Sequence, residues 1–169
     1  FDEKQLIFQS RPLGQDCDQI YIMNLDGSGK RLVSTGKGRT TCSYFLPDGK
    51  TILYASTHAA SPDCPPPPDF SKGYTWALYK TYDIFFADTS GGSLRQITTT
   101  PGYDAEATVS PMGDKIVFTS VRDGDLELYT MDIDGKNQKR LTYHIGYDGG
   151  AFFSWDGKKI VFRASAPKD

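Results

Sequence analysis

Hydrophobic and polar residues alternate along the chain in short segments separated by turns rich in Gly, Asp and Pro, and no segment follows a helical period. The pattern also repeats itself. Lys-Ile-Val-Phe occurs at 115–118 and 159–162, and Gly-Tyr-Asp occurs at 102–104 and 146–148, each pair being 44 residues apart. A period of about 40–45 residues, with four short strands in each unit, is typical of the blades of a β-propeller.

A third copy lies earlier in the chain, because residues 46–54 align with 110–118 at an offset of 64 residues. The additional 20 residues predict an insertion, and the segment 59–79, rich in proline and aromatic residues, supplies it. A partial copy precedes it, since 19–27 matches 127–135. We therefore expect a single domain over residues 1–169, with blade repeats near 1–37, 38–101, 102–145 and 146–169.

Each repeat predicts four antiparallel strands. The first alternates small and apolar residues, the second is a continuous apolar run, the third alternates, and the fourth is short and polar. The fold class is thus all-β: a β-propeller of four-stranded antiparallel blades, with about three blade equivalents present. Closed propellers usually have four to eight blades. Either the chain is part of a longer propeller, which we favour, or another chain completes the ring.

Composition and charge narrow the classes of partner. The chain has 169 residues and a net charge of −2, so no basic surface is expected for nucleic acid or anionic lipid. No apolar run approaches the ~18 residues of a transmembrane helix. No signal peptide is recognisable, but the chain begins at Phe1, so we expect a trimmed or partial N-terminus.

The three cysteines, Cys17, Cys42 and Cys64, have no C-x-x-C spacing. His58 and His144 do not complete a zinc pattern with them, so neither a metal nor another cofactor is expected. Two interpretations stay open. The cysteines are buried free thiols, or Cys42 and Cys64 form a disulfide that ties a loop to a strand in an oxidising compartment.

Two repeated motifs carry a family resemblance. Leu-Pro-Asp-Gly-Lys-x-Ile-x-Tyr at 46–54, with its copies, and Leu-Tyr-x-Met-Asp-x-Asp-Gly at 128–135, followed by Arg-Leu-Thr, resemble the WD-like repeats of TolB-type propellers. Residues 120–129 resemble the hairpin between that family's second and third strands. The resemblance implies a propeller that binds proteins in the bacterial envelope, either alone or fused to peptidases or other hydrolases. It also implies a periplasmic or otherwise exported bacterial protein.

Strand order predicts where a binding site would lie. In an up-and-down blade, the link that enters the first strand and the link between the second and third strands emerge on one side. Residues of those links would ring the mouth of the central channel, where loops on a rigid scaffold commonly bind partners. The predicted rim consists of Arg39, Tyr103, Asp104, Glu106, Tyr147 and Asp148. In the alternative interpretation, the aspartates cap their own turns and tie blades together.

The insertion 59–79 rises from the same side. It combines proline stiffness with aromatic side chains, which are frequent anchors of protein interfaces. The predicted insertion interface consists of Phe70, Tyr74, Trp76 and Tyr79. The alternative is a lid folded onto its own blade.

Catalytic motifs are absent from the sequence: there is no G-x-S-x-G, H-E-x-x-H or P-loop, and no pair of histidines near a carboxylate. Asp104 and Glu106 could act as an acid/base pair only on grounds of proximity, so we expect no enzymatic activity and no catalytic residues.

The expected function is a non-catalytic protein-interaction module or accessory subunit of a bacterial envelope or membrane-attached complex. Its expected partners are other proteins and further propeller blades from the same or another chain. One alternative is the propeller of a larger exported hydrolase or peptidase that gates or binds substrate. The other is a propeller that binds a small ligand or carbohydrate.

Overall fold

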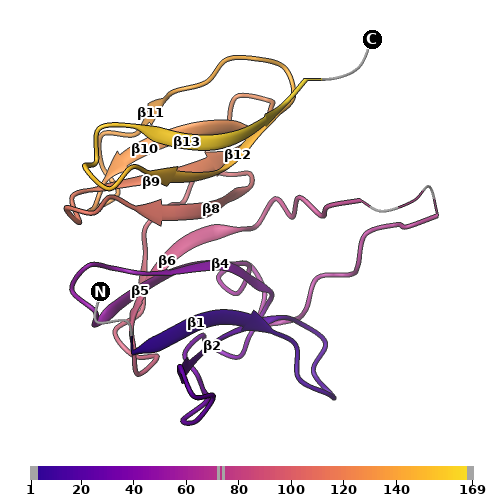
Figure 1. Cartoon of the computed structure of the whole chain (residues 1–169). Helices are drawn as coiled ribbons and strands as arrows, with labels where there is room; N and C mark the ends of the chain where they lie inside the picture. The colour runs from indigo at the N-terminus through magenta and orange to yellow at the C-terminus, as the bar shows by residue number, and fades with distance from the viewer. Residues whose placement is uncertain (1–3, 72, 74, 167–169) are drawn as a thin grey trace.

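The computed structural model describes residues 4–71, 73 and 75–166 and contains thirteen β-strands (Figure 1). The described residues form no helix, so none that could cross a membrane occurs among them. The strands are β1 (Gln5–Ser10), β2 (Gln19–Asn24), β3 (Arg31–Leu32), β4 (Thr40–Phe45), β5 (Thr51–Ser56), β6 (Asp83–Asp88), β7 (Arg95–Gln96), β8 (Asp104–Val109), β9 (Lys115–Ser120), β10 (Glu127–Asp132), β11 (Lys139–Arg140), β12 (Tyr147–Phe153) and β13 (Ile160–Ser165).

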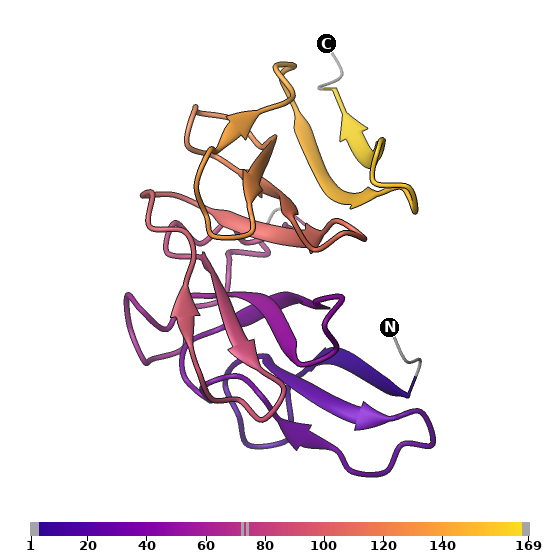
Figure 2. The ribbon, with the colours of Figure 1, turned by 90° about the vertical axis from the view of Figure 1, so that its left-hand side faces the viewer.

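These strands form four separate antiparallel sheets, which follow one another in chain order (Figure 2). Two are complete four-stranded blades, β4 to β7 and β8 to β11. The N-terminal sheet holds β1, β2 and β3, which correspond to the second, third and fourth strands of a blade. The C-terminal sheet holds only the first two, β12 and β13. The prediction of an all-β protein with four-stranded antiparallel blades is confirmed.

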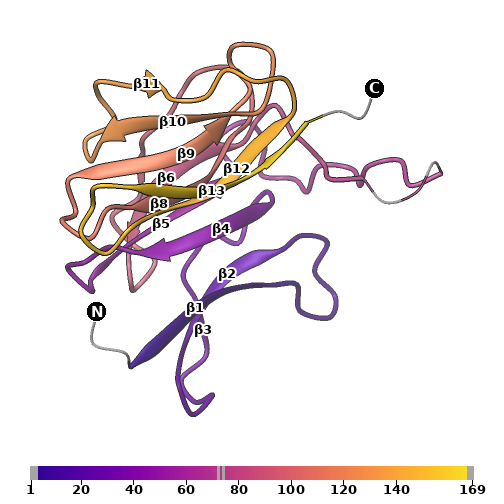
Figure 3. The same cartoon turned by 45° about the horizontal axis from the view of Figure 1, so that its top comes forward.

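The core lies between neighbouring blades, and the second strand of each complete blade is buried on both faces. In β5, Leu53 packs toward the following blade, whereas Ile52 and Tyr54 pack toward the preceding one. Because both faces are covered, such a strand is a continuous apolar run instead of an alternating one. The innermost strands β4, β8 and β12 lie next to one another across the blades (Figure 3).

The hairpin between the third and fourth strands of a blade packs against the preceding blade. Gly135 in this turn has a φ of +90°, and a Cβ there would lie 2.9 Å from the carbonyl oxygen of Ile97. Glycine is therefore required at position 135 for two reasons: the backbone is left-handed, and the Ile97 carbonyl leaves no room for a Cβ.

Every complete innermost strand carries a β-bulge at the same place. The register shifts fall between Thr41 and Tyr44 in β4, and at the equivalent steps of β8 and β12. The bulged residues Cys42, Glu106 and Gly150 all have left-handed backbones, with φ of +52°, +56° and +59°. Bulges of this kind redirect a side chain and bend the strand.

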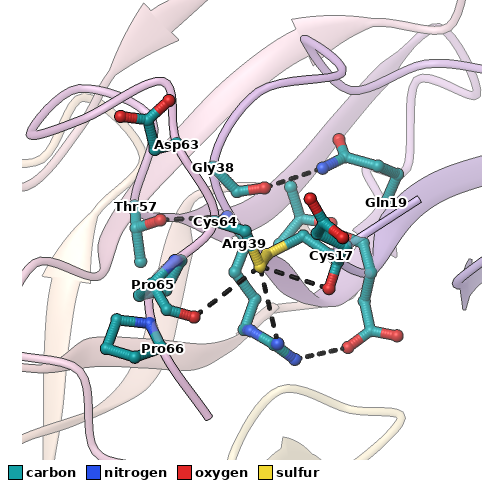
Figure 4. The surroundings of a disulfide bond; sticks show 12 residues. Cys17, Gln19, Gly38, Arg39, Thr57, Asp63, Cys64, Pro65 and Pro66 are labelled. Carbon is teal, nitrogen blue, oxygen red and sulfur yellow. Dashed lines mark hydrogen bonds and ion pairs between the residues drawn. A yellow bond between two sulfur atoms is a disulfide. The ribbon is translucent and has the colours of Figure 1, made fainter. Parts of the chain in front are cut away.

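A disulfide joins Cys17 to Cys64, with a Cα–Cα distance of 5.6 Å, and Cys42 is a free thiol (Figure 4). The prediction of a Cys42–Cys64 bond is therefore wrong. Cys42 occupies the bulge of the innermost strand β4, beside Glu106 in the bulge of β8. Cys17 lies in the β1–β2 loop, which meets the start of the β5–β6 connection.

Candidate functional site

The candidate site lies at the channel mouth, where the β5–β6 connection meets the innermost strands. The described residues of this connection, 57–71, 73 and 75–82, form no strand, and the connection projects from the blades as a long arm (Figure 1). We call residues 59–79 the arm. The disulfide fixes its first part (Figure 4). A hydrogen bond of 2.8 Å from the backbone N–H of Gly38 to the carbonyl of Pro62 supports the same attachment. The arm therefore starts from a rigid base.

Glu106 is the centre of a hydrogen-bond network that joins two blades. Its Oε2 accepts bonds from the Tyr147 hydroxyl at 2.7 Å, the Gly150 N–H at 2.8 Å and the Thr119 hydroxyl at 3.0 Å. Its Oε1 accepts a longer bond, 3.4 Å, from the Tyr103 hydroxyl. Three donors thus saturate one carboxylate oxygen, whereas the other has only a weak protein partner.

Burial changes the acidity of the tyrosines around this carboxylate. The pKa of Tyr103 is raised, first by burial and then by the negative charge of Glu106. The pKa of Tyr147 is raised by burial and by its hydrogen bond to Glu106. Both hydroxyls therefore remain protonated and donate to the carboxylate at physiological pH.

Trp76 connects the arm to this network. Its side chain lines the same hollows as Tyr103 and Glu106, although Trp76 keeps 57% of its surface exposed. One part of the ring thus lies against the blades, and the rest is open to contact with another molecule. This arrangement resembles the anchored, half-exposed aromatic residue of a protein interface.

Three adjoining hollows surround Trp76. The largest, about 440 Å³, is also lined by Leu78, Leu126, Glu106, Tyr147 and Arg163. A second of about 300 Å³ lies over the bulges of the innermost strands, and a third of about 240 Å³ lies under the arm beside Phe70 and Tyr79. The mouth is thus an open, largely apolar surface that holds two carboxylates: Glu106 near the bulges, and Asp18, paired with Arg39, under the arm.

The predicted rim residues divide into three groups. Tyr103, Glu106 and Tyr147 come together as described. Arg39 lies apart, forming an ion pair of 2.8 Å with Asp18 and stacking on Tyr79 at 5.7 Å.

The two rim aspartates are both buried, with 1% exposure for Asp104 and 5% for Asp148. Asp104 forms an ion pair of 2.8 Å with Arg122 of its own blade. Asp148 lines a different hollow on the far side of β12 and β13 from the Glu106 network.

The predicted residues of the insertion interface are placed as follows. Phe70 and Trp76 are each more than half exposed. Tyr79 lies closer to the blades, and its hydroxyl donates to the carbonyl of Pro66 at 2.8 Å. Tyr74 lies outside the described residues.

Six residues described in the site were not predicted: Asp18, Leu78, Thr119, Leu126, Gly150 and Arg163. Thr119 and Arg163 occupy the same position of the second strand in successive blades, so the repeat alignment could have indicated them. Asp18 and Leu126 reach the site only through the course of their loops, for which the sequence has no repeat signal.

The described residues include a free thiol and an imidazole that is bonded to a hydroxyl. Burial, more than any neighbour, raises the pKa of the Cys42 thiol, which disfavours the reactive thiolate. His58 hydrogen-bonds to the Ser56 hydroxyl at 2.8 Å and stacks on Phe85, and burial lowers its pKa. Among the described residues, no group of three or more His, Cys, Asp or Glu side chains is placed to hold a metal ion.

Comparisons with known proteins agree with this architecture. The family model described as "TolB beta propeller domain" matches residues 74–168. The putative TolB from Agrobacterium tumefaciens superposes with a TM-score of 0.73 at 22% identity, over 97% of this chain and 51% of that chain. TolB from Acinetobacter baumannii gives a TM-score of 0.71 at 25% identity, over 95% of this chain and 35% of that chain. A chain of the nidogen/laminin complex gives 0.69 at 14% identity, over 96% of this chain and 53% of that one. The chain therefore spans about half of these structures or less.

Proposed function

We propose, since this chain belongs to the TolB beta propeller domain family, that it is a non-catalytic protein-interaction module of an exported bacterial protein, acting in an envelope or membrane-attached complex. Family membership supports the propeller scaffold, and the role is argued from the channel mouth. The partner is another protein, which contacts the arm and the hollows around Trp76.

The observation that carries the proposal is the exposure of large apolar side chains on an arm held rigidly at both ends. Phe70, Trp76 and Leu78 are 53%, 57% and 41% exposed. The disulfide holds the start of the arm, and Tyr79 holds its end, because its hydroxyl donates to the Pro66 carbonyl and its ring contacts Arg39. A preformed aromatic surface of this kind loses little conformational entropy when a partner docks.

Export is supported by the Cys17–Cys64 disulfide, because such bonds persist mainly in oxidising compartments such as the periplasm. The family resemblance supports the same localisation. A non-catalytic role is supported by the Glu106 network. This carboxylate is committed to holding two blades together, with three donors on one oxygen.

The test is affinity capture from a solubilised bacterial envelope fraction, followed by measurement of affinity for the captured protein. The variant Phe70→Ser/Trp76→Ser removes both arm aromatics. The matched control is Trp155→Ser, because Trp155 is 87% exposed in the β12–β13 turn, away from the mouth. We expect the arm variant to lose at least about 30-fold in affinity, the effect of a ~2 kcal/mol hot spot. Equal affinity of all three proteins would contradict the proposal.

A second candidate, binding of a small ligand or carbohydrate, is favoured by the 440 Å³ hollow and by the weakly satisfied Oε1 of Glu106. Aromatic surfaces beside a hydrogen-bond acceptor suit hydroxylated rings. Saturation-transfer NMR with a panel of mono- and disaccharides would detect such binding. A signal that Trp76→Ser abolishes would favour this candidate over the protein partner.

A further inference from the structure

A hollow of about 240 Å³ lies beneath the arm, between its aromatic residues and the blades. The arm forms one wall, and the other is formed by β1, the β1–β2 loop, the start of β4 and the tyrosines that precede β6 and β8. The equivalent connection of the following blade, residues 121–126, is much shorter than the β5–β6 connection. The hollow therefore belongs to the insertion of this chain and not to the repeated blade.

Aromatic rings make up much of this lining. The ring of Tyr82 is 5.9 Å from that of Tyr79, at an angle of 56°, and 5.7 Å from that of Tyr103, at 83°. Phe70 and Trp76 of the arm face the same space. The hollow is smaller than the ~300–1,000 Å³ of most ligand sites, so it suits one ring better than a chain of rings.

Polar groups without a partner also line the hollow. Tyr82 is only 4% exposed, yet its hydroxyl makes no hydrogen bond with any described residue. Unlike the fully enclosed hydroxyl of Tyr54, it remains open to the hollow. The side-chain amide of Gln9 and Oδ1 of Asp18 also have no partner in the described part of the chain. A buried hydroxyl of this kind is unfavourable unless a bound molecule supplies its hydrogen bond.

The charge in the hollow is balanced, which narrows the class of ligand. Among the described residues, its charged side chains are Asp18 and Arg39, which form an ion pair of 2.8 Å beside the disulfide (Figure 4). A phosphate, a carboxylate or a quaternary ammonium group would bring an unmatched charge into this site. A phenol ring is neutral, but its one hydroxyl leaves most of the polar groups unsatisfied. A ring with several hydroxyls satisfies them, because each hydroxyl both donates and accepts.

We propose that the hollow beneath the arm binds one neutral saccharide ring. The C–H bonds on one face of the sugar pack against the aromatic rings, whose faces carry partial negative charge. The sugar hydroxyls bond to the Tyr82 hydroxyl, the Gln9 amide and Oδ1 of Asp18. This site differs from the 440 Å³ hollow beside Glu106, which Tyr82 does not line. It goes beyond the protein-interaction role and does not depend on it.

The experiment titrates the ¹⁵N-labelled chain with the methyl β-glycosides of D-glucose, D-galactose and D-mannose, each to about 20 mM. We expect at least one of them to shift the amide signals of residues 39–41 and 79–82, with a dissociation constant of about 1 mM. This is the affinity that an ordinary ligand efficiency gives for about 13 non-hydrogen atoms. The corresponding uronic acid, which adds a negative charge, should bind at least about tenfold more weakly.

Two variants and a matched control locate the site. Tyr82→Phe removes a hydroxyl without a partner and Gln9→Ala an exposed amide, so both should fold like the wild type. We expect each to bind the sugar about five- to tenfold more weakly, the effect of losing one hydrogen bond. Tyr54→Phe removes another buried hydroxyl without a partner, from the packing between blades, and should bind like the wild type.

Three results would overturn the proposal. If none of the three glycosides bound, the hollow would not be a saccharide site. If Tyr82→Phe bound the sugar like the wild type, the sugar would occupy another hollow, such as the one beside Glu106. If the uronic acid bound more tightly than the neutral sugar, the class of ligand would be wrong. Because Tyr82→Phe keeps Phe70 and Trp76, its affinity for a protein partner is expected to be unchanged, so the two proposals fail separately.

Discussion

The Cys17–Cys64 disulfide closes a long loop and should contribute a large share of the stability of this chain. The cysteines are 47 positions apart, so the bond restricts about 48 residues of the unfolded chain. The loop-closure model gives an entropy change that corresponds to about 4 kcal/mol at 25 °C for a loop of this length, at the upper end of the usual 2–4 kcal/mol. For a domain of this size, each kcal/mol shifts the melting temperature by about 2–4 °C.

We therefore expect Cys17→Ala/Cys64→Ala to melt roughly 8–16 °C below the wild type in differential scanning calorimetry. The matched control is Cys42→Ala, which removes the one free thiol and no cross-link. Its loss should be about 1 kcal/mol or less, because only a small, partly exposed side chain is truncated. Thiol titration of the unfolded, non-reduced wild type should find one reactive group per chain.

Two results would refute this reasoning. If Cys42→Ala melted as low as the double variant, Cys42 would take part in the cross-link. If the double variant melted with the wild type, the bond would not restrict the unfolded chain as the loop-closure model requires. Hydrogen exchange gives a second measurement, since loss of the bond should speed exchange in the arm more than in β8 to β11.

Three further predictions concern ionisable groups. Asp104→Asn leaves Arg122 buried without its partner and should reduce the free energy of unfolding in urea by about 3–5 kcal/mol. Burial raises the pKa of Asp83 to about 6, so this group stabilises the fold below pH ~4 and loses that contribution as the pH rises through 6. Asp83→Asn should therefore be more stable than the wild type at pH 7, by about 1 kcal/mol when its half-exposed position is allowed for. At pH 4 the variant should show no such gain. Glu106→Gln should lower the raised pKa of Tyr147, detectable by ultraviolet titration above pH 10, while an unchanged titration would show that burial alone sets it.

The sequence predicted the blades because repetition is a global signal. The repeat of 115–118 at 159–162, with the earlier copy at 51–54, predicts the same strand at each place, and the four-stranded order of the two complete blades agrees with it. The repeat also aligned Cys42, Glu106 and Gly150, but their left-handed backbones could not be inferred, because only Gly150 is a residue that prefers this conformation.

The pairing of the cysteines depended on loops outside the repeat. Three cysteines allow three pairings, and strand order alone does not show that the β1–β2 loop reaches the base of the arm. Trp76 illustrates the same limit. Its position beside Tyr103 depends on the path of a segment that is not repeated in the chain. The composition of that segment is visible in the sequence, but no other copy shows which of its residues face the blades.

The rim prediction rested on strand topology and did not address the burial of the residues. Asp104 lies where the first strand begins, as expected, yet Arg122 from the neighbouring hairpin covers it. Exposure of a loop residue depends on which side chain lies above it. Here that side chain comes from a position 18 residues later in the sequence.

Glu106 also has a geometric consequence for the whole ring. The Glu106 carboxylate accepts a hydrogen bond from the Gly150 N–H of the next innermost strand, so this side chain sets the distance between the two bulges. The number of blades that fit around the axis depends on the angle between adjacent blades. A spacer between innermost strands controls that angle more strongly than one at the outer edge of the blades. A shorter side chain at position 106 would let two innermost strands lie closer together. A ring of such blades would then have a different diameter.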